Sequence, residues 1–218
     1  MAASSRAHRI VIHMSMPVSY IGPNLEVDPS DDIFRLASSV YSATTLLPAS
    51  TLSGWYERNS EVFWIARDGE KLVAYMTMLP LSHEAFASTL EPQFDEKGLS
   101  ASDVLRYSND GDHFGFVSSI VVHPDYRGSG VSRQLRAYFL DTLVNWWGCG
   151  RRIVRLSAEA LNDRGASMMN SLGLSEHVRS DHGSIILSAI CDDMTLKRCR
   201  DTIREKMDNQ TSERIALR

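Results

Sequence analysis

The sequence predicts a single domain of the α/β or α+β class. Apolar runs rich in β-branched and aromatic residues alternate along the chain with segments whose apolar residues recur at helical spacing. The chain has 218 residues, 43% of them hydrophobic, which is enough for one packed core. It contains no internal repeat or low-complexity tract. We therefore expect strands and helices to share one continuous core.

The first half of the chain predicts two helices and a hairpin. Apolar residues at helical spacing predict a helix over residues 31–43, with Ser30 or Asp31 as its N-cap. A second short helix is expected over residues 52–58. Residues 62–81 predict two strands joined at Asp68-Gly69, because Asp-Gly is a strong hairpin signal. The run IVIHM at residues 10–14 is a candidate first strand.

The second half predicts strands at residues 113–124, 152–160 and 183–190, with helices over residues 131–147 and 163–174. Residues 192–208 predict an exposed amphipathic helix, with Leu196, Cys199, Ile203 and Met207 on one side. The polar, acidic segment 83–112 interrupts this pattern and is a candidate lid or substrate loop.

Composition excludes several classes of protein. The formal net charge of -4 disfavours a dedicated nucleic-acid binder. The three cysteines lie far apart without a CxxC pair, which indicates a reducing compartment and no disulfide framework. No apolar run reaches the roughly 18 residues of a membrane span, so no membrane partner is expected. The apolar patch near the N-terminus is too short for a secretory signal, so we expect a cytoplasmic protein.

One short motif, Arg127-Gly128-Ser129-Gly130, links a predicted strand to a predicted helix. The first amides of a helix are unpaired and carry a partial positive charge, and glycines let them approach an anion closely. Arg127 can add a charge-assisted contact to a phosphate oxygen. The motif therefore predicts a pyrophosphate site, and the alternative is a simple tight turn. Two rival phosphate motifs, GxxxxGK[ST] and GxGxxG with its downstream acid, are missing from the sequence.

The stretch SSIVVHPDYRGSGVSRQL, residues 118–135, resembles the acetyl-CoA signature of the GNAT superfamily of N-acetyltransferases. A second block, EALNDRGASMMNSLGL, is similar to the family's strand–Asn–helix segment, with Asn162 at the usual Asn. Ser132 departs from the family, which usually has Gly or Ala there. The resemblance covers about residues 31–189 and implies a mixed, mostly antiparallel sheet flanked by helices.

The resemblance divides the chain into three parts. Residues 1–30 are an N-terminal extension or first strand, residues 31–190 are the GNAT acetyltransferase domain, and residues 191–218 are a C-terminal helix and tail. The helix is expected to pack on its own domain, to act as an interaction arm or to form a homodimer contact.

The resemblance also implies how acetyl-CoA is held as the acyl donor. The amides after Arg127 would hold the pyrophosphate, and the strand before them would pair its backbone with the pantetheine arm. Asn162 would contact the pantetheine, and it is equally a candidate N-cap for the next helix. The residues assigned to the cofactor are Ile120, Val121, Val122, Arg127, Gly128, Ser129, Gly130, Val131, Ser132 and Asn162. No metal is expected.

Acetylation of an amine requires a base, because an amine with a pKa of about 10.4 is protonated at neutral pH. Glu159 and His113 are the candidate bases that we prefer on the central strands. The other candidates are Asp112, Glu84 and His83.

The family's usual acid, a tyrosine, is replaced by Met169, which cannot donate a proton. Another hydroxyl or a water can replace it; Tyr126, Tyr138 and Ser167 are the hydroxyls available. The step can also run without an acid, since protonating the leaving thiol gains only about 2 kcal/mol. The third explanation is a protein that binds acyl-CoA without turning it over.

Three hypotheses follow. The first is an acyl-CoA-dependent N-acyltransferase, without a metal, that moves an acetyl group to an amine that the sequence does not identify. The second is an acyl-CoA-binding regulatory or interaction module on the same fold. The third is a transferase for longer acyl chains.

Overall fold

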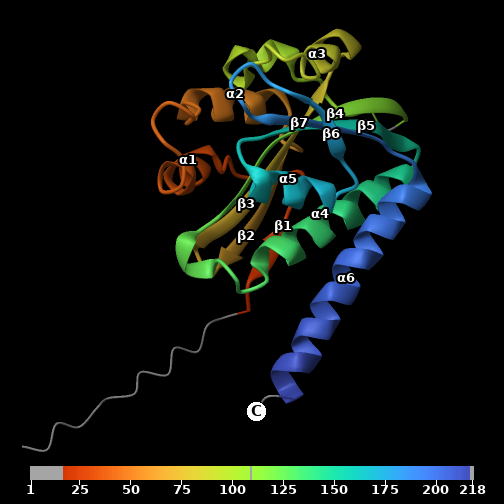
Figure 1. The fold of residues 1–218 in the computed structure, drawn as a ribbon. Coiled ribbons are helices and arrows are strands. Elements are labelled where there is room, and N and C mark those ends of the chain that lie inside the picture. Colours follow the sequence, from red (N-terminus) through yellow and green to blue (C-terminus); the bar gives the residue numbers. More distant parts are fainter. Residues whose placement is uncertain (1–16, 109, 217–218) are drawn as a thin grey trace, which may run out of the picture.

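A seven-stranded sheet forms the centre of the protein (Figure 1). The computed structural model describes residues 17–108 and 110–216. The strands are β1 (Ser19–Ile21), β2 (Phe63–Asp68), β3 (Lys71–Leu81), β4 (Gly111–Val122), β5 (Arg151–Ala160), β6 (Ser175–Arg179) and β7 (Ile185–Ile190). Their order in the sheet is β1-β2-β3-β4-β5-β7-β6. Every neighbouring pair is antiparallel except β4 and β5, which confirms the mixed, mostly antiparallel sheet.

Helices cover both faces of this sheet. They are α1 (Ser30–Ser38), α2 (Ala49–Arg58), α3 (His83–Ser88), α4 (Val131–Gly148), α5 (Asp163–Asn170) and α6 (Asp193–Ala216). One core lies between the sheet and α1, α2 and α3, and the other lies between the sheet and α4, α5 and α6. Side chains of β4 point to both faces of the sheet and so contribute to both cores. Phe116 and Val121 face the first core, and Val117 and Ile120 face the second.

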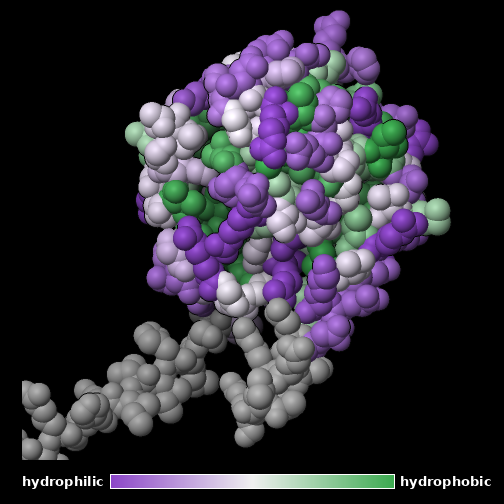
Figure 2. Space-filling view, in the orientation of Figure 1, coloured by the Kyte–Doolittle hydropathy of each residue, from purple (hydrophilic) through white to green (hydrophobic). Residues whose placement is uncertain are grey.

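The hairpin and the long helix α4 lie where the sequence predicts them. The amphipathic helix α6 begins close to its expected start and continues to Ala216, eight residues past its expected end. Gly69 and Glu70 form the hairpin turn between the paired residues Asp68 and Lys71, and Gly69 has a positive φ of 59°, a conformation that suits glycine. On α6, Leu196 and Ile203 are buried against the rest of the domain. Arg204 pairs with Asp141 of α4 at 2.6 Å. Figure 2 shows the hydrophilic outer face of α6.

Several details differ from the expectation. Helix α1 ends at Ser38, five residues before its expected end. The N-cap of α1 is Pro29, not Ser30 or Asp31, because the Asp28 carboxylate accepts the Ser30 amide at 2.9 Å and the helix starts directly after the proline. The edge strand β6 was not predicted, since it has mostly exposed polar residues. Helix α2 starts at Ala49, three residues before its expected start. The candidate strand at residues 10–14 lies outside the described residues.

The segment between β3 and β4, here the β3–β4 segment (residues 82–108), is packed on the domain. It contains α3 and two short 3-10 helices, η1 (Glu96–Gly98) and η2 (Ala101–Asp103). Its own residues Phe86, Phe94 and Val104 are buried in the core. The Thr89 hydroxyl hydrogen-bonds to the hydroxyl of Ser157 on β5 at 2.7 Å. This segment therefore forms a fixed wall of the domain.

Replacing Ile203 on α6 by alanine is expected to lower the free energy of unfolding by about 2–4 kcal/mol, because a fully buried aliphatic side chain leaves a cavity. The exposed Lys206 on the same helix is the control, and its replacement by alanine should change the value by less than about 0.5 kcal/mol. Urea unfolding of the three proteins measures both effects. Equal midpoints for the two variants would show that α6 contributes no packing energy.

Candidate functional site

The parallel pairing of β4 and β5 stops in the middle of the sheet. The two strands pair from Gly111 and Arg151 as far as Val117 and Ala158. Beyond this point β4 pairs only with β3 and β5 pairs only with β7 in the described structure. A bulge marks the separation, since Thr77 pairs with Ser119 and Met78 with Val117, which leaves Ser118 without a partner residue on β3. The backbone of residues 118–122 therefore faces a gap on its β5 side.

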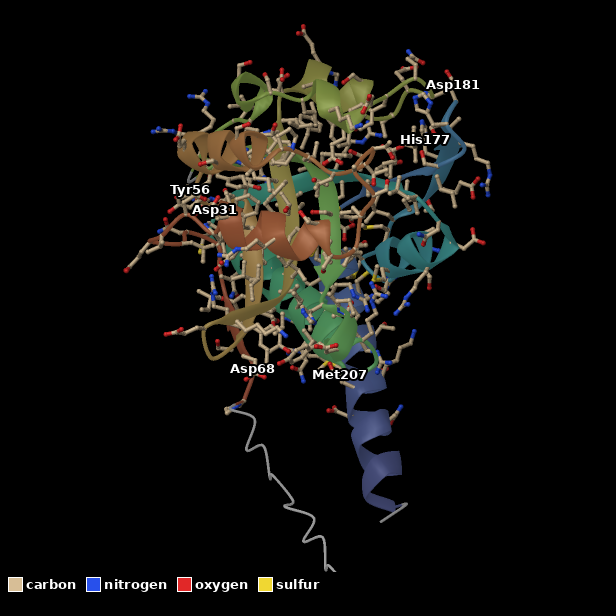
Figure 3. The ribbon with its side chains drawn as sticks, turned by 90° about the vertical axis from the view of Figure 1, so that its left-hand side faces the viewer. Asp31, Tyr56, Asp68, His177, Asp181 and Met207 are labelled. Carbon is tan, nitrogen blue, oxygen red and sulfur yellow. The ribbon has the colours of Figure 1, made fainter. Side chains whose placement is uncertain are left out.

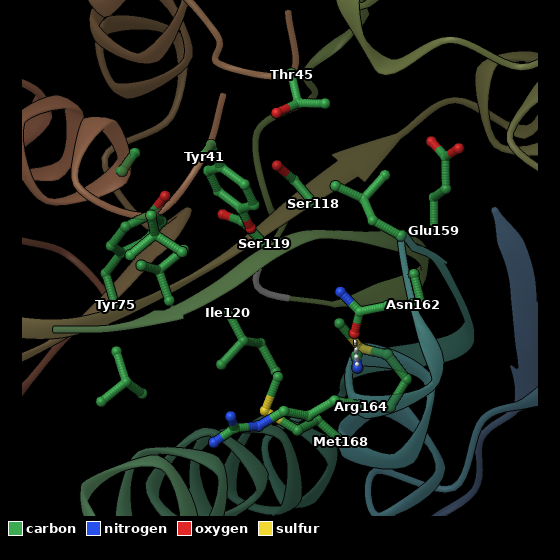
Figure 4. A pocket seen from close by; sticks show the side chains of 18 of the residues that line it. Tyr41, Thr45, Tyr75, Ser118, Ser119, Ile120, Glu159, Asn162, Arg164 and Met168 are labelled. Atoms are coloured by element: carbon green, nitrogen blue, oxygen red, sulfur yellow. Dashed lines mark hydrogen bonds between the residues drawn. The ribbon is translucent and has the colours of Figure 1, made fainter. Parts of the chain in front are cut away.

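A cleft of about 960 Å³ occupies this gap and reaches both faces of the sheet (Figure 4). On one face it is lined by α1, the α1–α2 connection and the β3–β4 segment. On the other face it is lined by the β4–α4 connection, the first turns of α4 and α5. A molecule in this cleft can therefore touch side chains from both cores at once.

The cleft ends on the α4 side in a glycine-rich cradle, residues 127–132. Gly128 and Gly130 have φ values of 79° and 99°, and a Cβ added to either would meet nothing within 4 Å. Gly130 is the N-cap of α4 and has no side chain to cap the helix. The partial positive charge of the helix N-terminus is therefore open to the cleft.

Arginines surround the cradle although the whole chain is acidic. Those that line the cleft are Arg127, Arg133, Arg136 and Arg164. Arg136 is buried, and its guanidinium donates to the Met168 carbonyl at 3.4 Å and to the Ser171 hydroxyl. Burial lowers its pKa to about 10, so it stays charged at neutral pH while it joins α4 to α5.

Asn162 has the N-cap role that the sequence offered for it, and it also lines the cleft. Its Oδ1 accepts the Gly165 amide at 2.9 Å and caps α5. Its side-chain nitrogen points toward the cleft in Figure 4, where it can donate to a ligand. Ser132 also lines the cleft, and its hydroxyl donates to the Met168 sulfur at 3.6 Å, which turns it toward α5.

The opposite end of the cleft carries carboxylates. Glu159 follows the last residue of β5 that pairs with β4, and its carboxylate accepts a hydrogen bond from the Ser184 hydroxyl. Asp95 and Glu96 come from the β3–β4 segment. The cleft is therefore basic at the cradle and acidic at the other end.

Glu96 is the most perturbed acid of this group. Its Oε1 is buried without a hydrogen-bond partner among the described residues. Burial raises the pKa of its carboxyl to about 8, with further increases from Glu159 and Asp95, whereas the Ser118 hydroxyl lowers it. Glu96 therefore lies near Ser118, the residue at the β4 bulge. Burial raises the pKa of Tyr41, and the negative charge of Glu96 raises it further. Tyr41 and Ser118 are among the cleft side chains drawn in Figure 4.

The structure separates the two candidate bases. Glu159 lines the cleft, but His113 lies at the far end of β4, where its Nε2 is 3.2 Å from the Ser108 hydroxyl. Burial lowers the pKa of His113. His113 therefore lies outside the cleft, in the part of β4 that is still paired with β5. Asp112, Glu84 and His83 also lie outside the cleft.

Met169 is buried in the core beneath α5, which accounts for a hydrophobic residue at this position. Two of the replacement hydroxyls are already engaged: Tyr126 donates to Asp68 at 2.5 Å and Tyr138 donates to the Gly22 carbonyl at 2.6 Å. Ser167 lines the cleft. Tyr41, which also lines it, was not recognised from the sequence.

Most of the cleft side chains that were not predicted from the sequence lie outside the cradle motif. Glu96 counted only as one acid in an acidic segment, and nothing local marks it as buried. Arg133 and Arg136 could have been predicted. They lie three residues apart on the helix that follows the cradle, a spacing that places both on one face of that helix.

A model of the acetyltransferase (GNAT) family matches residues 31–174, two thirds of the chain. The chain belongs to the GNAT family. Solved structures share its fold at low sequence identity. The loading GNATL domain of CurA from Lyngbya majuscula has a TM-score of 0.59 at 10% identity, over 80% of this chain and 98% of its own.

Two further solved structures share the fold. The NatC complex bound to Gag peptide and CoA gives a TM-score of 0.56 at 12% identity, over 81% of this chain and all of the matched one. The ribosomal-protein-S18-alanine N-acetyltransferase from Escherichia coli gives a TM-score of 0.51 at 16% identity, over 80% of this chain and 94% of its own. No curated protein sequence matches the chain significantly.

Two searches of the described residues were negative. No helix between residues 17 and 216 is long and apolar enough to cross a membrane. Within the same part of the chain, no cluster of three or more His, Cys, Asp or Glu side chains is arranged to hold a metal ion.

The raised pKa of Glu96 predicts a pH-dependent stability. Between its usual pKa near 4.5 and its folded value of about 8, the folded state binds a proton that the unfolded state releases. The stabilisation of the folded state that this proton provides is complete below pH 4.5 and is lost as the pH rises to about 8. The free energy of unfolding of the wild type should therefore fall, relative to Glu96→Gln, between pH 5 and pH 8.

Urea unfolding at both pH values measures this difference. Glu91→Gln, a change at an exposed glutamate of the same segment, is the matched control and should track the wild type. The free energies of unfolding of the wild type and Glu96→Gln are compared at each pH. If their difference is the same at pH 5 and pH 8, the pKa of Glu96 is not raised.

Proposed function

We propose that this protein transfers an acetyl group from acetyl-CoA to an amine by direct attack of the amine on the thioester. The observation that carries the proposal is the cleft between β4 and β5, with a cationic glycine cradle at one end and a buried carboxyl at the other. Membership of the GNAT family supports an acyl-CoA-dependent acyltransferase. The acetyl group and the amine acceptor are the finer parts of the proposal.

The donor would lie across the gap in the sheet. The amides of residues 127–132 and the surrounding arginines would hold the pyrophosphate. The pantetheine arm would pair with the free backbone side of Ile120, Val121 and Val122, as an added strand does. The side-chain nitrogen of Asn162 would donate to it. The thioester then lies at the Ser118 bulge, where a backbone amide can stabilise the negative charge that develops on its oxygen.

Glu96 would accept the proton from the amine. A carboxylate with a pKa of about 8 is a stronger base than an ordinary glutamate, and a useful fraction of it is ionised at neutral pH. The neutral amine forms the new C–N bond and the C–S bond breaks. The thiolate takes up a proton from Tyr41, and the proton that the new amide nitrogen loses returns to Tyr41. Tyr41 lines this part of the cleft and stays protonated, so it is the proton donor that we propose. Glu159 would hold the incoming ammonium.

Met169 favours a second candidate function, a module that binds acyl-CoA without turning it over. Release of free thiol from acetyl-CoA in the presence of a panel of amines separates the two functions. Amine-dependent release supports the enzyme, and tight binding without release supports the module.

The variant Gly130→Glu is expected to weaken acetyl-CoA binding by at least about 100-fold, because it places a negative charge and a strained side chain where the pyrophosphate would lie. Gly69→Glu adds the same side chain at another glycine of positive φ, in the β2–β3 hairpin, and should leave affinity unchanged. Calorimetric titration with acetyl-CoA and with free CoA measures both variants. Wild-type affinity in Gly130→Glu would remove the cradle from the proposed site.

The variant Glu96→Gln is expected to lower kcat by about 100-fold, the usual contribution of a general base. The wild-type kcat should fall about tenfold for each pH unit below 8, because protonation removes the base, and the variant should lose this dependence. Steady-state kinetics from pH 6 to pH 9 measure it, with Glu91→Gln as control. A large loss in Glu159→Gln together with normal activity in Glu96→Gln would assign the base to Glu159.

A further inference from the structure

The acceptor end of the cleft is closed on two sides by bonds to the β3–β4 segment. The Lys97 ammonium donates to the Thr44 carbonyl in the α1–α2 connection. The Asp181 amide, in the β6–β7 turn, donates to the Pro92 carbonyl at 2.8 Å. Figure 3 shows Asp181 at the end of the molecule where this turn reaches the β3–β4 segment. Three separate parts of the chain are therefore joined around the acceptor end.

This enclosure limits the size of the acceptor. A peptide that presents its terminal amine needs an open groove for the residues that follow. Here the α1–α2 connection and the β6–β7 turn are both fixed to one segment, which is itself anchored to β5 through Thr89 and Ser157. These walls therefore favour a small acceptor over a peptide chain that continues past its amine.

The wall on the α1–α2 side is apolar. Val40, Leu46 and Leu47 line it and are only partly covered, and Leu52 and Tyr75 lie behind them. Partly exposed aliphatic side chains inside a cleft gain free energy when an apolar group removes them from water.

The acidic side chains at the acceptor end favour a positively charged group on the acceptor. The carboxyl groups of Asp95, Glu96 and Glu159 line the acceptor end, and the ammonium of Lys97 is bound to the Thr44 carbonyl. A protonated amine is attracted to this end, whereas a molecule with its own carboxylate is repelled. The arginines lie at the cradle, on the donor side of the cleft.

We infer that the acceptor is a small primary amine on an uncharged apolar body, such as an arylalkylamine, and not a peptide or an amino acid. This inference rests on the proposed function. It assigns the apolar wall to the acceptor body and the acidic groups to its ammonium.

Four acceptors test the inference with acetyl-CoA as donor: 2-phenylethylamine, ethylamine, phenylalanine and a tetrapeptide that begins with phenylalanine. The value of kcat/KM for 2-phenylethylamine should exceed that for ethylamine by about 30-fold, because a phenyl group is removed from water. It should exceed that for phenylalanine by at least about tenfold, because of carboxylate repulsion. The tetrapeptide should be the poorest acceptor.

Matched variants locate the preference in the apolar wall. Leu47→Gln should reduce the preference for 2-phenylethylamine over ethylamine by about fivefold and leave the Kd of acetyl-CoA unchanged. Leu90→Gln makes the same change at a leucine that is equally half-buried but lies outside the cleft, and it should leave the preference unchanged.

Other outcomes overturn the inference. Faster turnover of the tetrapeptide or of phenylalanine would show an open or carboxylate-binding acceptor site. Transfer from hexanoyl-CoA to ethylamine that is faster than acetyl transfer, and is reduced by Leu47→Gln, would assign the apolar wall to the acyl chain. In each case acetyl-CoA still binds and the proposed function stands. Failure to bind acetyl-CoA, or to acetylate any amine, would remove the proposed function and this inference together.

Discussion

The end of β4–β5 pairing at Val117 is the constraint on which the rest of the site depends. Strands inside a sheet normally satisfy their backbone groups on both sides, but β4 from Ser119 onward pairs only with β3 in the described structure. The bulge at Ser118 increases the separation, and the helices on both faces hold it open. A ligand that offers hydrogen-bonding groups along an extended arm can take the place of the missing strand.

The two ends of the gap are built by different means. The cradle end is local: a strand, two glycines of positive φ and a helix start follow one another within about a dozen residues. The acceptor end is assembled from distant segments, since Tyr41, Glu96 and Glu159 meet only after folding. A carboxyl buried beside a second carboxyl destabilises the fold, and the anchored β3–β4 segment holds it there.

This difference explains what the sequence could predict. Hydrophobic periodicity was sufficient to predict the hairpin, helix α4 and the buried side of α6, because each of these patterns lies within a short stretch of the chain. The cradle was predictable for the same reason. Glu96 and the position of His113 were not, since burial and distance from the cleft depend on where β4 stops pairing, which no local pattern encodes. The edge strand β6 was missed because its residues carry almost no apolar signal.

The four arginines around the cradle lie on a chain whose formal net charge is -4. At physiological ionic strength charges are screened beyond about 8 Å, so an approaching anion does not experience the net charge of the whole protein. It experiences the arginines only once it is near the cradle. Capture of a polyanionic donor is therefore a short-range event, and long-range steering contributes little to its association rate.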